Sequence, residues 1–198
     1  KNVILSKGAI HYLRDSELNE NANYLKPKIN KDKIVTFIIG GPNRYYNYND
    51  KSIYKIFSKI ENIFIKKNFQ LLLIPSMRTP KKIIDKAKKY FDQNQIIISS
   101  VDKKAYLSSL RLADYIIVTC DSTSMISEAA MTGKPIYVAQ MPSMKKDNRF
   151  KKFFELFESL NIIRNLENSV ENWNYEKLFE TDRISGYIKN NFKNYDFF

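Results

Sequence analysis

The sequence is poor in the residues that form disulfides, bind zinc or act as catalytic bases. It contains one cysteine, Cys120, and one histidine, His11, among 198 residues. A single cysteine excludes an internal disulfide framework and is typical of a reducing compartment. A single histidine argues against a zinc site and against a Ser-His-Asp triad. We therefore expect no metal and no cofactor, and the sequence assigns no catalytic residue.

Long apolar runs and two common nucleotide-binding motifs are also missing. No stretch approaches the roughly 18 apolar residues of a membrane-spanning helix, and Lys1–Ile10 lacks the apolar core of a signal peptide. We expect a cytoplasmic protein, with peripheral membrane association as the alternative. Neither GxGxxG nor GK[ST] occurs, which argues against a dinucleotide-binding Rossmann fingerprint and against a P-loop.

Positive charge is abundant but dispersed. The formal net charge is +12, and only seven of the 33 basic residues are arginine. The lysines form scattered doublets such as Lys66-Lys67, Lys81-Lys82 and Lys88-Lys89, and AT-rich coding produces the same lysine, asparagine and isoleucine bias without selection for binding. We therefore expect solvated helix faces and no DNA or RNA partner, and a basic nucleic-acid-binding domain is the weakest of three functional hypotheses.

Short apolar runs, several of them rich in β-branched residues, predict the strands of a parallel sheet that is buried on both faces. These runs are Val3–Leu5, Ile34–Ile39, Gln70–Ile74, Gln95–Ile98, Tyr115–Thr119 and Ile136–Ala139. Val3–Leu5 precedes the regular pattern and is interpreted as a strand that ends a preceding domain. Asn19–Asp32 is interpreted as a polar connector.

Amphipathic segments alternate with these runs and predict helices. The predicted helices cover about Lys51–Lys67, Pro80–Phe91, Lys103–Ala113, Ser124–Thr132, Asn148–Leu160 and Tyr175–Asn190. Thr79-Pro80 is typical of a helix start, with Thr79 as the N-cap. Alternation of strand and helix predicts an α/β, Rossmann-like parallel sheet flanked by helices. We divide the chain into a connector or domain remnant (1–32), a Rossmann-like domain (33–165), and a C-terminal helix and aromatic tail (166–198).

Ligands of an open parallel sheet bind beyond the carboxyl ends of its strands, so we examined the residues after each predicted strand. After the second run come Gly40 and Gly41, which allow close backbone approach to an anion, followed by Arg44 as a possible phosphate partner. A tight turn is the alternative role for Gly41. After the third run comes Arg78, whose guanidinium suits phosphate better than an ammonium does.

The segment after Tyr115–Thr119 carries the most specific pattern. Ser122, Thr123 and Ser124 open a predicted helix, where hydroxyls and free amides can bind a diphosphate. Glu128 lies further along the same helix, where a carboxylate can accept the hydroxyls of a ribose. Ser122 and Ser124 taken singly are equally typical of N-caps. We interpret Cys120 as a small buried residue at the strand end, not as a nucleophile.

At these residues the sequence resembles a known donor-binding segment. Asp121-Ser122, Glu128-Ala129-Ala130 and Gly133-Lys134-Pro135 resemble GT-B glycosyltransferases and the related UDP-sugar 2-epimerases. The resemblance implies that the serine region holds the diphosphate and Glu128 the ribose. Met77 stands where a second arginine is expected, and Thr123 and Ser124 stand where the epimerases carry glycines.

A narrower resemblance, which runs to about Leu160, is to the mitochondrial fission Elm family, whose bacterial members are described as GT-B-like or as nucleoside-diphosphate-sugar epimerases. It is carried by Asn2–Leu5 with Gly8–His11, by Ile39–Tyr46, by Ser76–Pro80 and by Leu112–Pro135.

The resemblance implies that this chain is the donor-binding, C-terminal half of such a protein. An N-terminal Rossmann-like domain of the same protein would be its partner and would supply the acceptor side. The first hypothesis is therefore a nucleotide-sugar-binding half of a glycosyltransferase or epimerase-like protein, inactive alone. The alternative is a non-catalytic scaffold or interaction protein of the Elm type.

Overall fold

A computed structural model of the chain describes residues 3–145, 148–167 and 169–191. In these residues the strands are β1 Lys33–Ile39, β2 Phe69–Pro75, β3 Ile96–Ile97, β4 Tyr115–Thr119, β5 Ile136–Ala139 and β6 Ile163–Asn165. The α-helices are α1 Asp15–Glu20, α2 Asp50–Ile63, α3 Lys81–Tyr90, α4 Lys103–Leu112, α5 Thr123–Ala130, α6 Asn148–Ser159 and α7 Glu180–Asn191. Two 3₁₀ turns are η1 Lys26–Lys28 and η2 Ile65–Lys67.

The strands form one sheet in the order β3-β2-β1-β4-β5-β6, and every neighbouring pair is parallel. This confirms the predicted α/β class with a parallel sheet. The order is that of a doubly wound fold, in which the chain leaves the central pair of strands in opposite directions. The switch point therefore lies between the carboxyl ends of β1 and β4, where such folds leave room for a ligand.

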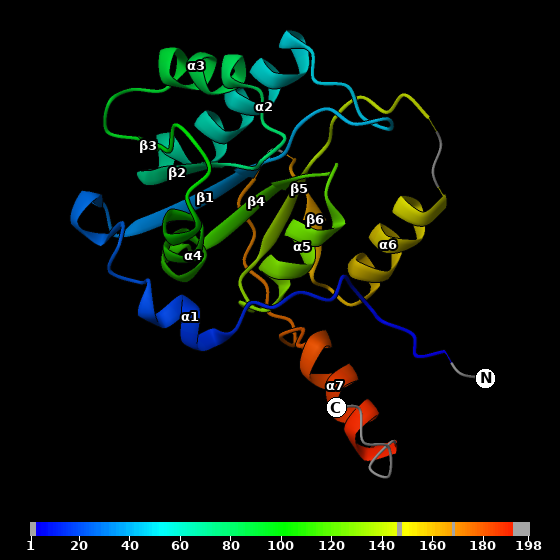
Figure 1. Cartoon of the computed structure of the whole chain (residues 1–198). Coiled ribbons are helices and arrows are strands. Elements are labelled where there is room, and N and C mark those ends of the chain that lie inside the picture. Colours follow the sequence, from blue (N-terminus) through cyan, green and yellow to red (C-terminus); the bar gives the residue numbers. More distant parts are fainter. Residues whose placement is uncertain (1–2, 146–147, 168, 192–198) are drawn as a thin grey trace.

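Helices cover both faces of the sheet, with α2 and α3 on one side and α4 and α5 on the other (Figure 1). β2 is buried along its whole length, as the apolar run predicts. Alternate strand residues face opposite helices: Leu72 and Ile74 cluster with Ala105 of α4, and Leu71 and Leu73 belong to the larger core cluster. The predicted apolar face of α2 is also confirmed, because all of its members are buried: Ile53, Ile56, Phe57, Ile60, Ile63 and the following Phe64.

The start of α3 differs from the prediction. Thr79 does not cap this helix; Pro80 occupies the N-cap position and the helix begins at Lys81. The Thr79 hydroxyl instead lies 2.7 Å from the carbonyl oxygen of Ile39 and 2.9 Å from that of Gly40. The hydroxyl therefore ties the loop after β2 to the loop after β1, a tertiary contact that local sequence rules do not reveal.

The N-terminal segment also departs from the prediction, because Val3–Leu5 is not a strand. Val3 and Leu5 are 71% and 81% exposed. Further along, the backbone N–H of Ala9 donates to the Ser127 hydroxyl of α5 at 2.9 Å and that of Lys7 to the Glu180 carboxylate at 2.7 Å. This part of the chain therefore bonds to side chains of helices and not to a sheet edge.

Three short elements were missed, and the start of the last helix was misplaced. α1 and η1 fall in and around the predicted polar connector, and α1 packs on α4. β6 was not predicted, and α7 begins later than expected, at Glu180. The predicted aromatic tail Phe192–Phe198 lies outside the described residues. Among the helices that are described, none combines the length and apolar character needed to cross a membrane.

Candidate functional site

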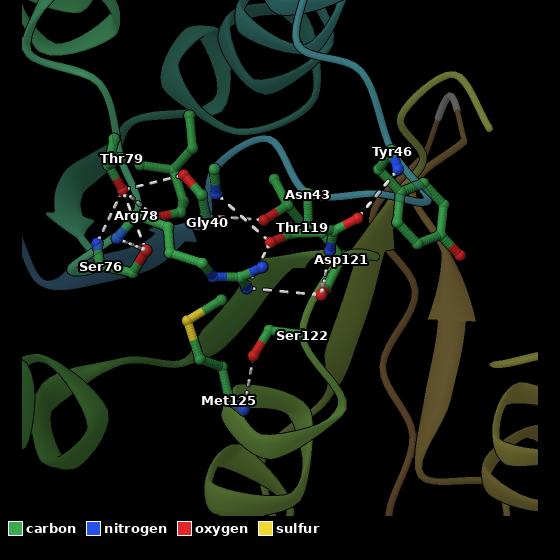
Figure 2. Close-up of polar contacts among 12 residues, drawn as sticks. Gly40, Asn43, Tyr46, Ser76, Arg78, Thr79, Thr119, Asp121, Ser122 and Met125 are labelled. Atoms are coloured by element: carbon green, nitrogen blue, oxygen red, sulfur yellow. Dashed lines mark hydrogen bonds and ion pairs between the residues drawn. The ribbon is translucent and has the colours of Figure 1, made fainter. Parts of the chain in front are cut away.

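Three loops meet at the switch point of the sheet. They follow β1, β2 and β4 and carry most of the residues that the sequence singled out (Figure 2). The carbonyl oxygen of Asp121 joins them: it accepts a hydrogen bond from the side-chain amide of Asn43 at 3.2 Å and lies 3.4 Å from a terminal nitrogen of Arg78. The predicted meeting of these loops at one sheet edge is therefore confirmed.

Asp121 places a carboxylate inside this junction. Its side chain is fully buried, and its partners come from different loops: the Tyr48 hydroxyl, a terminal nitrogen of Arg78 at 2.7 Å and the N–H of Gly41 at 3.3 Å. Burial of a carboxylate is unfavourable unless it is paired and hydrogen-bonded. Burial of Tyr48 and, after it, the charge of Asp121 raise the pKa of the Tyr48 phenol, which keeps it protonated as a donor.

The glycines after β1 leave room for close neighbours, Gly40 for the Asp121 carboxylate and Gly41 for the backbone of Arg78. A Cβ atom at Gly40 would lie 2.3 Å from the Asp121 carboxylate oxygens, and one at Gly41 would lie 1.9 Å from the backbone oxygen of Arg78. The N–H of Gly40 donates to the Thr119 hydroxyl at 2.8 Å. Both amides thus bond to the protein itself. The predicted contact of Gly40 and Gly41 with phosphate stays a prediction, and phosphate would have to compete for these donors.

Arg78 lies between the buried junction and the surface, with its side chain 42% exposed. Its own N–H donates to the Ser76 hydroxyl at 3.2 Å, which stabilises the turn after β2. Met77, where the resemblance suggests a second arginine, is 91% exposed. This turn therefore presents one guanidinium, already paired with Asp121.

The first turn of α5 combines a capping residue with exposed hydroxyl groups. The Ser122 side chain accepts from the N–H of Met125 at 3.4 Å, so the N-cap role of Ser122 is confirmed. Thr123 is partly exposed and Ser124 is exposed. The N–H groups at the start of a helix have no partner within the helix, and together with the helix dipole they favour an anion.

Glu128 lies about one and a half turns further along α5 than Thr123. Its carboxylate accepts a hydrogen bond from the Tyr106 hydroxyl of α4. Burial raises the pKa of Glu128, whereas the Tyr106 hydrogen bond and the nearby His11 imidazole oppose that rise. The Nδ1 atom of His11 is buried and has no hydrogen-bond partner in the described part of the chain. Glu128 is therefore a partly buried acid with spare acceptor capacity.

Arg44 lines a hollow of about 480 Å³ between the loop after β1, the start of α5, and α6, and Arg78 does not line it. The guanidinium of Arg44 stacks on Tyr45 with 4.7 Å to the ring centroid. Besides Arg44 and Thr123, the hollow is lined by Tyr45, Arg149, Phe150 and Phe153. The contribution of α6 was not predicted from the sequence, because its phenylalanines follow the period of an ordinary amphipathic helix.

Other residues of the recognised segment have structural roles. Cys120 is fully buried, and burial raises the pKa of its thiol to about 12, which confirms its interpretation as a core residue. Gly133 adopts a φ of +72°, in the left-handed region that favours glycine. The Lys134 ammonium donates to the backbone oxygens of Leu110 and Arg111 at the end of α4. In the described residues no three acidic, histidine or cysteine side chains gather in a way that could hold a metal ion.

Comparison with known proteins identifies the family. The sequence profile described as mitochondrial fission ELM1 matches residues 1–192. The chain belongs to the mitochondrial fission ELM1 family. It is 26% identical over 192 residues to the mitochondrial fission protein ELM1 of Arabidopsis thaliana, covering 94% of this chain and 45% of the plant protein.

A second relative is an uncharacterized protein of Rickettsia prowazekii. The two are 29% identical over 180 residues, which is 87% of this chain and 49% of the rickettsial protein. The chain therefore spans about half the length of these relatives.

Solved structures give more distant likenesses to this ELM1-family chain. The UDP-GlcNAc 2-epimerase of Neisseria meningitidis aligns with a TM-score of 0.47 and 12% identity, over 86% of this chain and 40% of the enzyme. The same enzyme from Methanocaldococcus jannaschii gives 0.47 and 15%, over 87% and 50%. Because these identities and TM-scores are low, the fold class rests on the order and direction of the strands described above.

Proposed function

We propose that this chain binds a nucleoside diphosphate-sugar at the carboxyl edge of its sheet. In this proposal the diphosphate lies at the start of α5, near Ser122, Thr123 and Ser124, and the ribose lies at Glu128. The location agrees with the general rule that doubly wound sheets bind ligands at the switch point.

The environment of the Glu128 carboxylate is the observation that carries the proposal. A carboxylate on this part of α5 accepts one hydrogen bond from Tyr106, and its burial raises its pKa. A ribose diol offers two donors, which would compensate the loss of water around the charge. The start of α5 supplies the complementary half, because its unpaired amides favour the phosphate that is covalently attached to that ribose.

Arg78 is the proposed electrostatic partner of the diphosphate. Its side chain is 42% exposed while its guanidinium remains anchored to Asp121. An anchored guanidinium loses little conformational freedom when a phosphate approaches, although Asp121 offsets part of its charge. Arg44, Gly40 and Gly41 are further candidates, with the glycine amides already engaged.

The experiment is a thermal-shift series with UDP, GDP, ADP and CDP on the 198-residue chain, followed by calorimetry with the nucleotide that gives the largest shift. Glu128→Gln keeps an acceptor for Tyr106 but loses the charge. We expect it to lower the affinity for the nucleotide by about tenfold, the usual cost of losing a charged hydrogen-bond partner. Glu155→Gln, an exposed change on α6, is the control and should leave affinity unchanged.

Two results would overturn the proposal. One is that no nucleotide raises the melting temperature at millimolar concentration. The other is that Glu128→Gln binds as tightly as the unsubstituted chain. Because the chain spans about half of its relatives, turnover, acceptor and stereochemistry belong to the further proposal that a second Rossmann-like domain closes over this edge.

A specific observation favours the alternative of a non-catalytic scaffold. Asp121 already supplies an anion to the Gly41 amide and to Arg78, two of the groups that were expected to bind phosphate. A scaffold that had lost its ligand would keep such an internal pair. Absence of nucleotide binding, with Asp121 variants unfolding the chain, is the combination that this alternative predicts.

A further inference from the structure

The hollow at Arg44 lies on the other side of α5 from Glu128. Thr123 faces the hollow together with Phe150 and Phe153 of α6, whereas Glu128 bonds to Tyr106 of α4. Residues five apart on a helix point in directions that differ by roughly 140°. A ligand whose ribose is at Glu128 and whose phosphates are at the start of α5 therefore directs its remaining group toward the hollow.

The surface of the hollow is aromatic. Tyr45 and Phe150 pack edge to face with ring centroids 5.5 Å apart, and Phe153 contributes a third ring to the lining. The three rings are partly exposed, and aromatic side chains of this kind can accept the apolar C–H face of a pyranose; a volume of about 480 Å³ is sufficient for one sugar.

The charge at the rim is positive. Arg44 is exposed, and it forms no ion pair with any carboxylate in the described residues, in contrast with Arg78, which is paired with Asp121. No acidic side chain of the described part of the chain lines the hollow. The guanidinium carbon of Arg44 lies over the Tyr45 ring, and the planar fork of a guanidinium suits a planar, bidentate partner. Arg149 donates to the Tyr45 hydroxyl at 3.0 Å and helps to hold that ring.

We propose that the sugar of the nucleotide-sugar carries a carboxylate, as a hexuronic acid does, and that Arg44 binds this carboxylate while the aromatic rings of the hollow hold the sugar ring. The inference rests on the proposed nucleotide-sugar function and assigns the substrate class of the same site. It moves Arg44 from the phosphate to the sugar.

The test compares nucleotide-sugars that share the base selected above and differ only in the carboxylate, for example UDP-glucuronic acid with UDP-glucose, or GDP-mannuronic acid with GDP-mannose. Calorimetry of the chain should give an affinity about tenfold higher for the acidic sugar, the size expected of one charged hydrogen-bond pair. Arg44→Gln should abolish this preference, so that the acidic and neutral sugars bind with about equal affinity. Its affinity for the free nucleoside diphosphate should stay within about twofold of that of the unsubstituted chain.

Arg164→Gln is the matched control, because Arg164 also stacks on an aromatic ring, Trp173, at 4.5 Å but lies outside the hollow. It should retain the preference. Equal affinity for the acidic and neutral sugars in the unsubstituted chain would overturn the inference while leaving the nucleotide site intact. The inference would also be overturned if Arg44→Gln lowered the affinity for the free nucleoside diphosphate as much as the affinity for the acidic nucleotide-sugar, because Arg44 would then be a phosphate ligand. Failure of every nucleoside diphosphate to bind would instead refute the proposed function beneath it.

Discussion

Asp121 and Glu128 are the two acidic side chains of the segment between β4 and β5, and their surroundings differ. Asp121 is fully buried and has Tyr48, Arg78 and the Gly41 amide as partners. Glu128 is only partly buried and accepts a hydrogen bond from Tyr106. A carboxylate whose acceptor sites are filled by the protein stabilises the loops around it. One that is partly desolvated with spare acceptors is suited to a ligand.

The largest effect is expected at Asp121. Asp121→Ala removes the common partner of the three loops and leaves Tyr48 and Arg78 without their acceptor, so we expect a loss of about 3 kcal/mol in the free energy of unfolding. Urea denaturation measures it. Asp15→Ala removes the exposed pair with Lys177 and should cost less than about 1 kcal/mol. Equal losses in the two variants would contradict a structural role for Asp121.

The next effect concerns the glycine loop that covers Asp121. Gly41→Ala would place a Cβ atom 1.9 Å from the backbone oxygen of Arg78, and we expect a loss of about 2 kcal/mol from the forced shift. Gly186→Ala in α7 is the control: a Cβ atom there meets nothing within 4 Å, and helix propensity predicts a gain of about 0.5–1 kcal/mol. A tolerated Gly41→Ala would mean that this loop moves freely, as a ligand-binding loop without an internal anion would.

A smaller effect separates the two serines at the start of α5. Ser122→Ala removes the hydroxyl that caps Met125 and should cost about 1 kcal/mol. Ser124→Ala, at an exposed position, should stay within about 0.5 kcal/mol. Thermal unfolding of the two variants side by side measures the difference. The opposite ranking would show that Ser124, not Ser122, caps the helix.

The smallest effect has the opposite sign. Burial raises the pKa of Glu128 above its ordinary 4.5. The charged form therefore destabilises the folded chain once the pH rises beyond that value. The cost is absent at lower pH, where the acid is protonated in both the folded and the unfolded chain. Glu128→Gln cannot ionise and should gain about 0.5 kcal/mol at neutral pH, typical of a change that leaves packing intact. The gain should vanish near about pH 4. A gain that persists in acid would require another cause.

Sequence patterns predicted the sheet because buried parallel strands are continuous apolar runs that stand out at any position in the chain. They did not identify β6, which has only three residues, and they misassigned Val3–Leu5, where Val3 and Leu5 are exposed. A run of three residues carries too little periodicity to distinguish a strand from an extended segment.

The candidate site was likewise predicted in part. The rule on strand ends located Ser122, Arg78 and Glu128, because it depends on topology alone. It did not distinguish Asp121 as an internal anion, because that role requires Tyr48 and Arg78 to converge from distant parts of the chain. It assigned Arg44 to phosphate, which stays a prediction, and it did not reveal the hollow beside Arg44, because that hollow depends on α6.

The central claim is that the start of α5 and Glu128 bind a nucleoside diphosphate while Asp121 keeps the glycine loop closed. Amide chemical shifts measured while the best-binding nucleoside diphosphate is titrated into the isotope-labelled chain test it most directly. We predict the largest changes at Thr123, Ser124 and Glu128, with small changes at Gly40 and Gly41, whose amides already donate to Thr119 and Asp121. Changes centred on the glycine loop, or spread over the lysine doublets with none in α5, would contradict the account.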